Sequence, residues 1–147
     1  MSTMYDLAKK IENGEIADLS ESNFKPKDYA VPNGYADKIA EEIANTKEEM
    51  KVTQLRKLFT KIKNIQNKIK TNEDVNKYAN EIAFILPELA YARGRRLITE
   101  DFYVLIKSCL LNNQNQIRLA SKLEFDNFVK FLEAILAYYK KHSLKKS

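Results

Sequence analysis

One stretch, Thr53 to Lys70 (TQLRKLFTKIKNIQNKIK), constrains the fold of this chain more than any other. Its apolar residues recur every three or four positions, which is the spacing of one face of an α-helix. No acidic residue interrupts it. Its six basic residues fall on two flanks of the apolar stripe: Lys57, Lys61 and Lys68 on one, and Arg56, Lys63 and Lys70 on the other. Because such a helix gives up ion pairs between its own turns, we expect its flanks to attract a polyanion.

The rest of the 147-residue chain also carries apolar residues at helical spacing, and no alternating strand pattern is visible. Further helices are predicted over residues 4–11, 35–45, 73–94, 100–110 and 121–139. Residues 1–33 contain Gly14, Pro26 and Pro32, so apart from the short helix they are predicted to be flexible or extended. The chain is therefore predicted to be all-α: an N-terminal extension over residues 1–33, followed by a compact bundle of about five helices in a single domain over residues 34–147.

The helix predicted over residues 73–94 is apolar on a wide face that includes Phe84, so we expect it to be central in the bundle. Pro87 lies inside it. A proline there removes one hydrogen bond and clashes with a carbonyl of the preceding turn, so we expect a kink or a fresh helix start. Gly94 is the expected C-cap of this helix.

Other polar residues predict helix ends and one ion pair. Thr53 is the expected N-cap of the basic helix, and Ser121 and Glu124 have the spacing of a capping box. Glu133 lies beside the apolar stripe of the last helix, where a partly buried carboxylate needs a partner. We therefore predict that it pairs with Arg93 or Arg95, and the paired arginine would then be structural.

The side chains that catalysis or metal binding would need are scarce. The one histidine, His142, lies in a basic tail that is expected to fray, and Cys109 lies on an apolar helix face. The three glycines are far apart, so no phosphate-binding glycine loop is present. We predict no catalytic residue, no metal site and no cofactor, and the chain is not expected to be an enzyme. A single cysteine, without a secretory signal or a long apolar run, fits a cytoplasmic protein without a membrane span.

The net charge of +5 is unevenly divided along the chain. Residues 1–51 carry 7 basic and 11 acidic side chains, a balance of −4, whereas residues 52–147 carry 18 and 9, a balance of +9. Clustering of this kind favours a nucleic-acid partner. The candidate nucleic-acid-binding residues are Arg56, Lys57, Lys61, Lys63, Arg93, Arg95 and Arg96. Two simpler interpretations stay open: a solvated lysine-rich face, and arginines that compensate the negative end of a helix dipole.

Tyrosines are a weaker indication of nucleic-acid binding. Tyr91, Tyr138 and Tyr139 have the aromatic faces on which bases can stack. At helical spacing, however, tyrosines more often belong to the core and keep only the hydroxyl group in water. Both interpretations are open from the sequence.

Three motifs, in order, resemble one protein family. They are QLRK at residues 54–57, YARGR at 91–95 and LEAILAY at 132–138. Together they are similar to the small helical subunit of type III-A CRISPR effector complexes, the Csm complexes, over about residues 35–142. Arg56 and Lys57 match the basic opening of the family pattern, and Arg95 matches its Gly-Arg.

This resemblance implies a helical bundle without an activity of its own. Copies of such a subunit stack along a filament of backbone subunits, contact the duplex of crRNA and target RNA, chiefly its target strand, and adjoin the large polymerase-like subunit. The partners implied are therefore crRNA and target RNA, the other Csm subunits and further copies of the same chain. A protein that leaves sequence reading to the guide needs only backbone contacts, which agrees with the charge pattern.

A second function remains possible from the residues. The chain could be a helical interaction or adaptor protein that binds protein partners through apolar or acidic faces and has no direct RNA role. Salt dependence separates the two, because binding to phosphates weakens steeply as salt is added.

Overall fold

The computed structural model describes residues 2–46 and 50–144, and these residues form eight α-helices and no β-strand. The predicted all-α bundle is confirmed, with more helices than the five expected. The helices are α1 (Thr3–Glu12), α2 (Pro26–Tyr29), α3 (Tyr35–Asn45), α4 (Val52–Lys68), α5 (Asn72–Lys77), α6 (Ala79–Gly94), α7 (Glu100–Leu110) and α8 (Lys122–Leu144).

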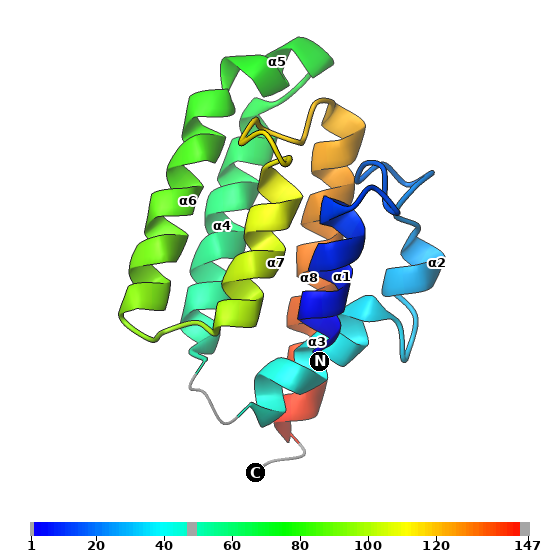
Figure 1. The fold of residues 1–147 in the computed structure, drawn as a ribbon, viewed down its shortest axis with the longest axis vertical. Helices are drawn as coiled ribbons and strands as arrows, with labels where there is room; N and C mark the ends of the chain where they lie inside the picture. The colour runs from blue at the N-terminus through cyan, green and yellow to red at the C-terminus, as the bar shows by residue number, and fades with distance from the viewer. Residues whose placement is uncertain (1, 47–49, 145–147) are drawn as a thin grey trace.

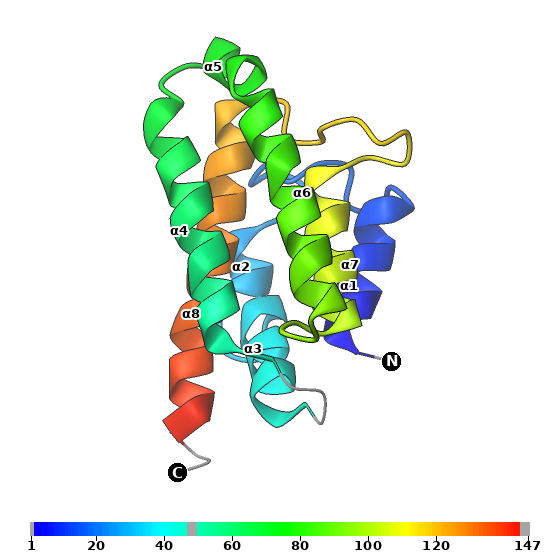
Figure 2. The same ribbon diagram turned by 90° about the vertical axis from the view of Figure 1, so that its left-hand side faces the viewer.

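The long helix α8 lies in the interior of the bundle, with α3 and α4 packed against it (Figure 1). Helix α1 packs on α7, and α6 packs on α7 and α4. Helices α4 and α6 run in opposite directions, and the short helix α5 joins them at one end (Figure 2). The N-terminal half of α4 therefore lies beside the C-terminal half of α6.

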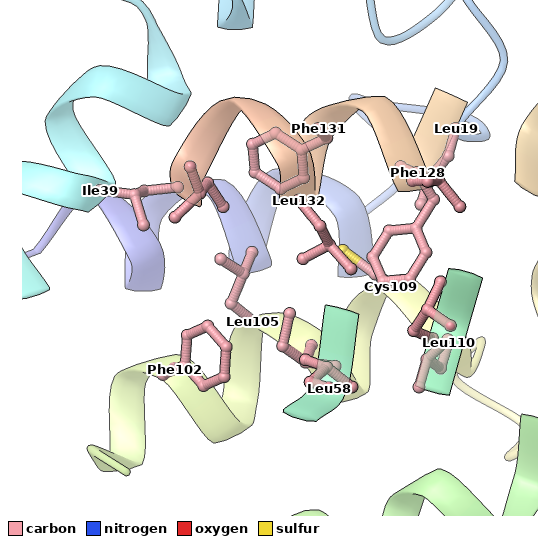
Figure 3. Close-up of a cluster of buried hydrophobic side chains, with 14 of the residues drawn as sticks. Leu19, Ile39, Leu58, Phe102, Leu105, Cys109, Leu110, Phe128, Phe131 and Leu132 are labelled. Atoms are coloured by element: carbon pink, nitrogen blue, oxygen red, sulfur yellow. The ribbon is translucent and has the colours of Figure 1, made fainter. Parts of the chain in front are cut away.

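The core is filled by side chains from several helices. Leu58 of α4, Leu105 and Cys109 of α7, and Phe128 and Leu132 of α8 meet in one cluster (Figure 3). Burial raises the pKa of the Cys109 thiol to about 12, which keeps it protonated and unreactive at neutral pH. The prediction that Cys109 is a small buried apolar residue is confirmed.

The N-terminal residues contribute to the same core. Helix α1 buries one apolar face, and the segment between α1 and α2, which is not helical, buries Leu19 and Phe24. Asn127 of α8 lies under this segment. Its side-chain amide donates hydrogen bonds to the carbonyls of Leu19 and Phe24, both at 2.8 Å, and accepts one from the Tyr29 hydroxyl at 2.6 Å. Buried polar contacts thus tie residues 19–29 to the bundle.

Two predicted features of α4 and of the 73–94 region differ in the structure. Helix α4 follows Lys51 and begins at Val52, so Thr53 is inside the helix and is not its N-cap. A fresh helix start at Pro87, one of the two expected alternatives, is also absent: α6 is continuous through Pro87, and the helix boundary in this region falls at Tyr78, between α5 and α6. The start of α5 is fixed by a capping box, in which the Asp74 carboxylate accepts the backbone N–H of Thr71 and also that of Lys70.

The C-terminal end of α6 is a Schellman motif without a glycine at its left-handed position. The N–H of Leu97 donates to the Ala92 carbonyl at 2.9 Å, and the N–H of Arg96 donates to the Arg93 carbonyl at 2.9 Å. This geometry requires a positive φ at Arg96, which is 60°. Gly94 is the last helical residue and Arg95 is the C-cap, so the predicted C-cap is displaced by one position, and the left-handed Arg96 follows it.

Other helix ends follow the sequence more closely. Ser121 accepts the N–H of Glu124, and the Glu124 carboxylate accepts the Ser121 hydroxyl and the Ala120 N–H, as in a capping box. At the other end of α8, the helix continues to Leu144, so the prediction of a frayed tail is wrong there. Residues 145–147 of that tail lie outside the described residues.

His142 is 8% exposed and packs against α3. Its Nε2 lies 2.5 Å from Asp37 Oδ1, and its Nδ1 lies 4.0 Å from a carboxylate oxygen of Glu41. Burial alone would raise the pKa of Asp37, but the hydrogen bonds from the Asn33 N–H and from His142 outweigh it, so the pKa is lowered. The predicted tail histidine is therefore a contact between the end of α8 and α3.

Candidate nucleic-acid interface

The basic helix α4 lies with its apolar stripe in the core and its two charged flanks beside different neighbours. Leu55, Leu58, Ile62 and Ile65 are buried. Between the stripe and one flank, the amide of Gln66 donates to Asp126 of α8 at 2.9 Å. The division into two flanks predicted from helical spacing is thus confirmed: one flank faces α6, and the other faces α8.

The flank that faces α6 is partly neutralised. Lys61 pairs with Glu88, and Lys68 pairs with Glu81 at 3.1 Å; both acids belong to α6. Neither pair joins two turns of α4, so the prediction that this helix gives up its internal ion pairs is not contradicted; the acids come from another helix, which the sequence pattern did not indicate. All four side chains are at least one-third exposed, so these pairs contribute little to stability.

Three cations of α4 remain available. Arg56, Lys57 and Lys63 are exposed, and in the part of the chain that the structure describes no carboxylate lies within ion-pair distance of them. Arg56 and Lys57 share a shallow outward surface of α4 with Thr53, Thr60, Lys61 and Asn64. We call this surface, together with Lys63, the α4 face. It is cationic and contains no acidic residue.

The three arginines at the end of α6 have different environments. Arg93 is half-buried: its Nε donates to Glu100 at 2.9 Å and its guanidinium to the Ile98 carbonyl at 3.2 Å. Arg95 is exposed and lies over the Tyr91 ring, 5.7 Å from its centre. Arg96 is exposed in the left-handed conformation described above. The geometry gives Arg93 a structural role and leaves Arg95 and Arg96 facing solvent.

The predicted pairing of Glu133 is wrong. Glu133 is exposed and shares a surface depression between α4 and α8 with Arg56, Tyr139 and Lys140. No residue of α6 lines that depression. Arg93 has Glu100 instead. The α-helical register of the last helix was predicted correctly, but Glu133 falls just outside the buried stripe.

The three tyrosines singled out from the sequence also have different environments. The Tyr138 hydroxyl donates to the Ala30 carbonyl at 2.6 Å, and Tyr139 is half-buried, so both contribute to the packing of the bundle. Tyr91 is 65% exposed. Among the three, Tyr91 alone presents its ring to solvent.

A groove between α4 and α6 was not predicted. It has a volume of about 440 Å³ and is lined by residues from the N-terminal half of α4 and the C-terminal half of α6. Apolar side chains line most of it, and Lys57, Lys61 and Arg95 stand at its edges. We call it the α4–α6 groove. No sequence signal marks it, because it arises from the separation of two helices.

The described residues contain no group of three or more histidine, cysteine or acidic side chains that could hold a metal ion. Within the same residues, no helix is both long and apolar enough to cross a membrane. The groups that this surface offers for binding are cationic side chains, amides, hydroxyls and exposed aromatic rings.

Comparison with protein families gives a match to the model described as Csm2 Type III-A, over residues 27–145. The match covers α2 through α8 and includes every candidate binding residue. Neither the curated proteins nor the solved structures contain a match to the chain.

Proposed function

The chain belongs to the Csm2 Type III-A family, whose members are small subunits of type III-A CRISPR effector complexes, and we propose that it binds the backbone of the crRNA–target RNA duplex there without catalysing a reaction. The proposed surface is the α4 face together with Arg95 and Arg96. Arg93 is left out of this surface because Glu100 and the Ile98 carbonyl hold it.

One observation carries the proposal. Arg56, Lys57 and Lys63 are exposed on a helix without acidic residues, and none has an ion-pair partner among the described residues. Unpaired cations in a row repel one another in the free protein, and a phosphate chain relieves that repulsion. Arg96 adds to the argument. A non-glycine residue in the left-handed region costs about 1 kcal/mol, and retained strain of this kind is typical of functional positions.

The chemistry of these residues fits a backbone contact better than base reading. Lysine and arginine neutralise phosphates irrespective of sequence. In an RNA-guided complex, base pairing with the guide supplies the sequence specificity, and the protein needs only shape and charge. The sequence carries no RRM, KH or zinc-finger signature of a base-reading module.

The partners that we propose are crRNA, target RNA, the backbone subunits, the large polymerase-like subunit and further copies of this chain. A single copy offers five cations without a carboxylate partner, enough for about four phosphate contacts, and should bind RNA weakly alone. Several copies in register on one duplex would bind far more tightly, because each later contact is intramolecular.

Fluorescence anisotropy with a labelled RNA duplex tests the RNA contact. Binding by about four phosphate contacts should weaken with log salt at a slope near −3. The double variant Arg56→Ala with Lys63→Ala should weaken binding of every duplex sequence alike and reduce the slope by about 2. Lys107→Ala is the matched control, since Lys107 is an exposed lysine of α7 beside Glu12.

Two outcomes would contradict the proposal. Binding that does not change with salt would favour the adaptor function, in which the chain binds only protein partners. A loss confined to one duplex sequence would show base reading instead of backbone binding. Co-purification of crRNA and backbone subunits with the tagged chain from its host tests membership of the complex separately.

A further inference from the structure

We propose that the α4–α6 groove binds a short amphipathic segment of a protein partner, with apolar side chains on one face and carboxylates beside them. This inference goes beyond the RNA contact, which uses the outward α4 face. The groove adjoins that face and shares Lys57 and Arg95 with the proposed RNA contact, but its apolar floor fits a different class of ligand.

The lining of the groove favours a protein segment over a nucleic acid. Its floor is formed by Leu58 of α4, Ile85 and Leu89 of α6, and Leu97 and Ile98 of the following segment. Removing apolar side chains from water is favourable, whereas a phosphate chain laid over the same floor would lose hydration without a hydrogen-bond donor to replace it. An apolar face is therefore the complement of this floor.

Exposed apolar residues extend the groove along α6. Phe84 and Tyr91 are 66% and 65% exposed, and Pro87 lies between them. Their spacing of three and four residues places all three on one face of the helix, and Pro87 and Tyr91 line the groove itself. A contiguous exposed apolar surface with aromatic residues is typical of a protein interaction site.

The charges at the groove edge specify the ligand further. Lys57 and Arg95 stand at opposite edges, and neither has a carboxylate partner among the described residues. Lys61 is already bound to Glu88. A partner segment that carries carboxylates beside its apolar face could form ion pairs with Lys57 and Arg95. Charge complementarity therefore favours an acidic amphipathic segment.

The length of the groove sets the length of the segment. The groove follows α4 from Gln54 to Lys61, which is about 10 Å at 1.5 Å per residue. A helix of about two turns covers that distance, with apolar side chains at three- and four-residue spacing toward the floor. The inferred ligand is thus a short acidic amphipathic helix.

Photo-crosslinking in the assembled complex tests the inference. Tyr91 is replaced by benzoylphenylalanine, the complex is purified from its host and irradiated, and crosslinked products are identified by mass spectrometry. We expect crosslinks to a protein segment in which acidic residues flank apolar residues at three- and four-residue spacing. The matched control carries the same photoreactive residue at Leu123, which is exposed on the first turn of α8, away from the groove.

Charge reversal provides the second arm. Lys57→Glu with Arg95→Glu should reduce the crosslink from position 91 at least tenfold per incorporated subunit, whereas Lys107→Glu should leave it within twofold. Crosslinks to RNA, crosslinks to a segment without the acidic amphipathic pattern, or a yield no higher than at position 123 would each overturn the inference. Because Lys57 and Arg95 also belong to the proposed RNA contact, the crosslink from position 91 is measured in the Arg56→Ala with Lys63→Ala variant as well. That variant weakens only the RNA contact and should leave the crosslink within twofold, and a tenfold loss there would overturn the inference.

Discussion

Replacing Asn127 by alanine should strongly destabilise the protein, because this buried side chain joins α8 to the N-terminal residues. Asn127 is 1% exposed. Its amide holds the carbonyls of Leu19 and Phe24 and the hydroxyl of Tyr29 at 2.6–2.8 Å. The Asn127→Ala variant removes all three hydrogen bonds and leaves three polar groups buried without their partner.

The expected loss follows from the three bonds. Each intramolecular hydrogen bond contributes about 1 kcal/mol net, and a buried polar group left unpaired costs about 1–3 kcal/mol. Allowing for partial relaxation toward water, we expect the free energy of unfolding to fall by about 3–5 kcal/mol. Since domains of this size are stable by about 5–15 kcal/mol, this is a large fraction of the total.

Urea denaturation followed by circular dichroism measures the change. Asn64→Ala is the matched control, because Asn64 is an exposed helical asparagine of α4. It reports the gain in helix propensity that alanine brings at both sites, about 0.5 kcal/mol. Tyr29→Phe removes only one of the three bonds and should cost an intermediate amount, about 1–2 kcal/mol.

The outcome also bears on the N-terminal residues, which were expected from the sequence to be flexible or extended. A loss below about 1 kcal/mol for Asn127→Ala, relative to Asn64→Ala, would refute the reasoning. It would mean that residues 19–29 leave the bundle readily and that their burial contributes little to stability. A loss near 4 kcal/mol would make them an integral part of the folded domain.

Three further changes test local features of the structure. Arg96→Gly should raise the free energy of unfolding by about 1 kcal/mol, since glycine adopts φ near 60° without strain, while reducing the salt slope of RNA binding by about 1; an unchanged stability would contradict the first part. Gly34→Ala should destabilise by about 1–3 kcal/mol in thermal unfolding, because a Cβ there would lie 2.7 Å from the Asp28 carbonyl oxygen; a neutral result would refute this steric argument. The pKa of Asp37 is lowered below 3.8 in the folded state, so its contribution is fully present above pH 3.8 and is lost as the pH falls through the lowered pKa. Asp37→Asn should cost about 1.5–3 kcal/mol at pH 7 and progressively less as the pH falls below 3.8, and a cost that does not change with pH would be inconsistent with a carboxylate held by the Asn33 N–H and His142.

The direction of each charged flank of α4 was predictable, whereas its partners were not. Helical spacing fixes which residues point away from Leu55 and Leu58, and the structure agrees. The pairing of Lys61 with Glu88 depends on which helix lies alongside and in which register. Those facts are set by tertiary packing, so a sequence pattern within α4 carries no information about them.

The predictions of where helices end were wrong for a related reason. Pro87 and Gly94 are strong local signals, yet the break falls at Tyr78 and the left-handed residue is Arg96. Packing of α6 on α4 and α7 fixes where the chain must turn, and local preferences of about 1 kcal/mol for Gly94 and about 3 kcal/mol for Pro87 yield to it. His142 is similar: its position near the end of the chain suggested fraying, but Asp37 of α3 binds it.

Phe84 explains why the groove escaped prediction. Periodicity identifies apolar faces, but it cannot tell a face covered by the same chain from one left for a partner. Helix α6 carries apolar residues on both sides: Ile82, Ile85 and Leu89 are buried, whereas Phe84 and Tyr91 are exposed. A helix with apolar residues on two sides needs neighbours on both sides to bury them, and this chain covers only one side of α6. The uncovered apolar side, with Phe84 and Tyr91, is the physical argument for a protein ligand at the α4–α6 groove.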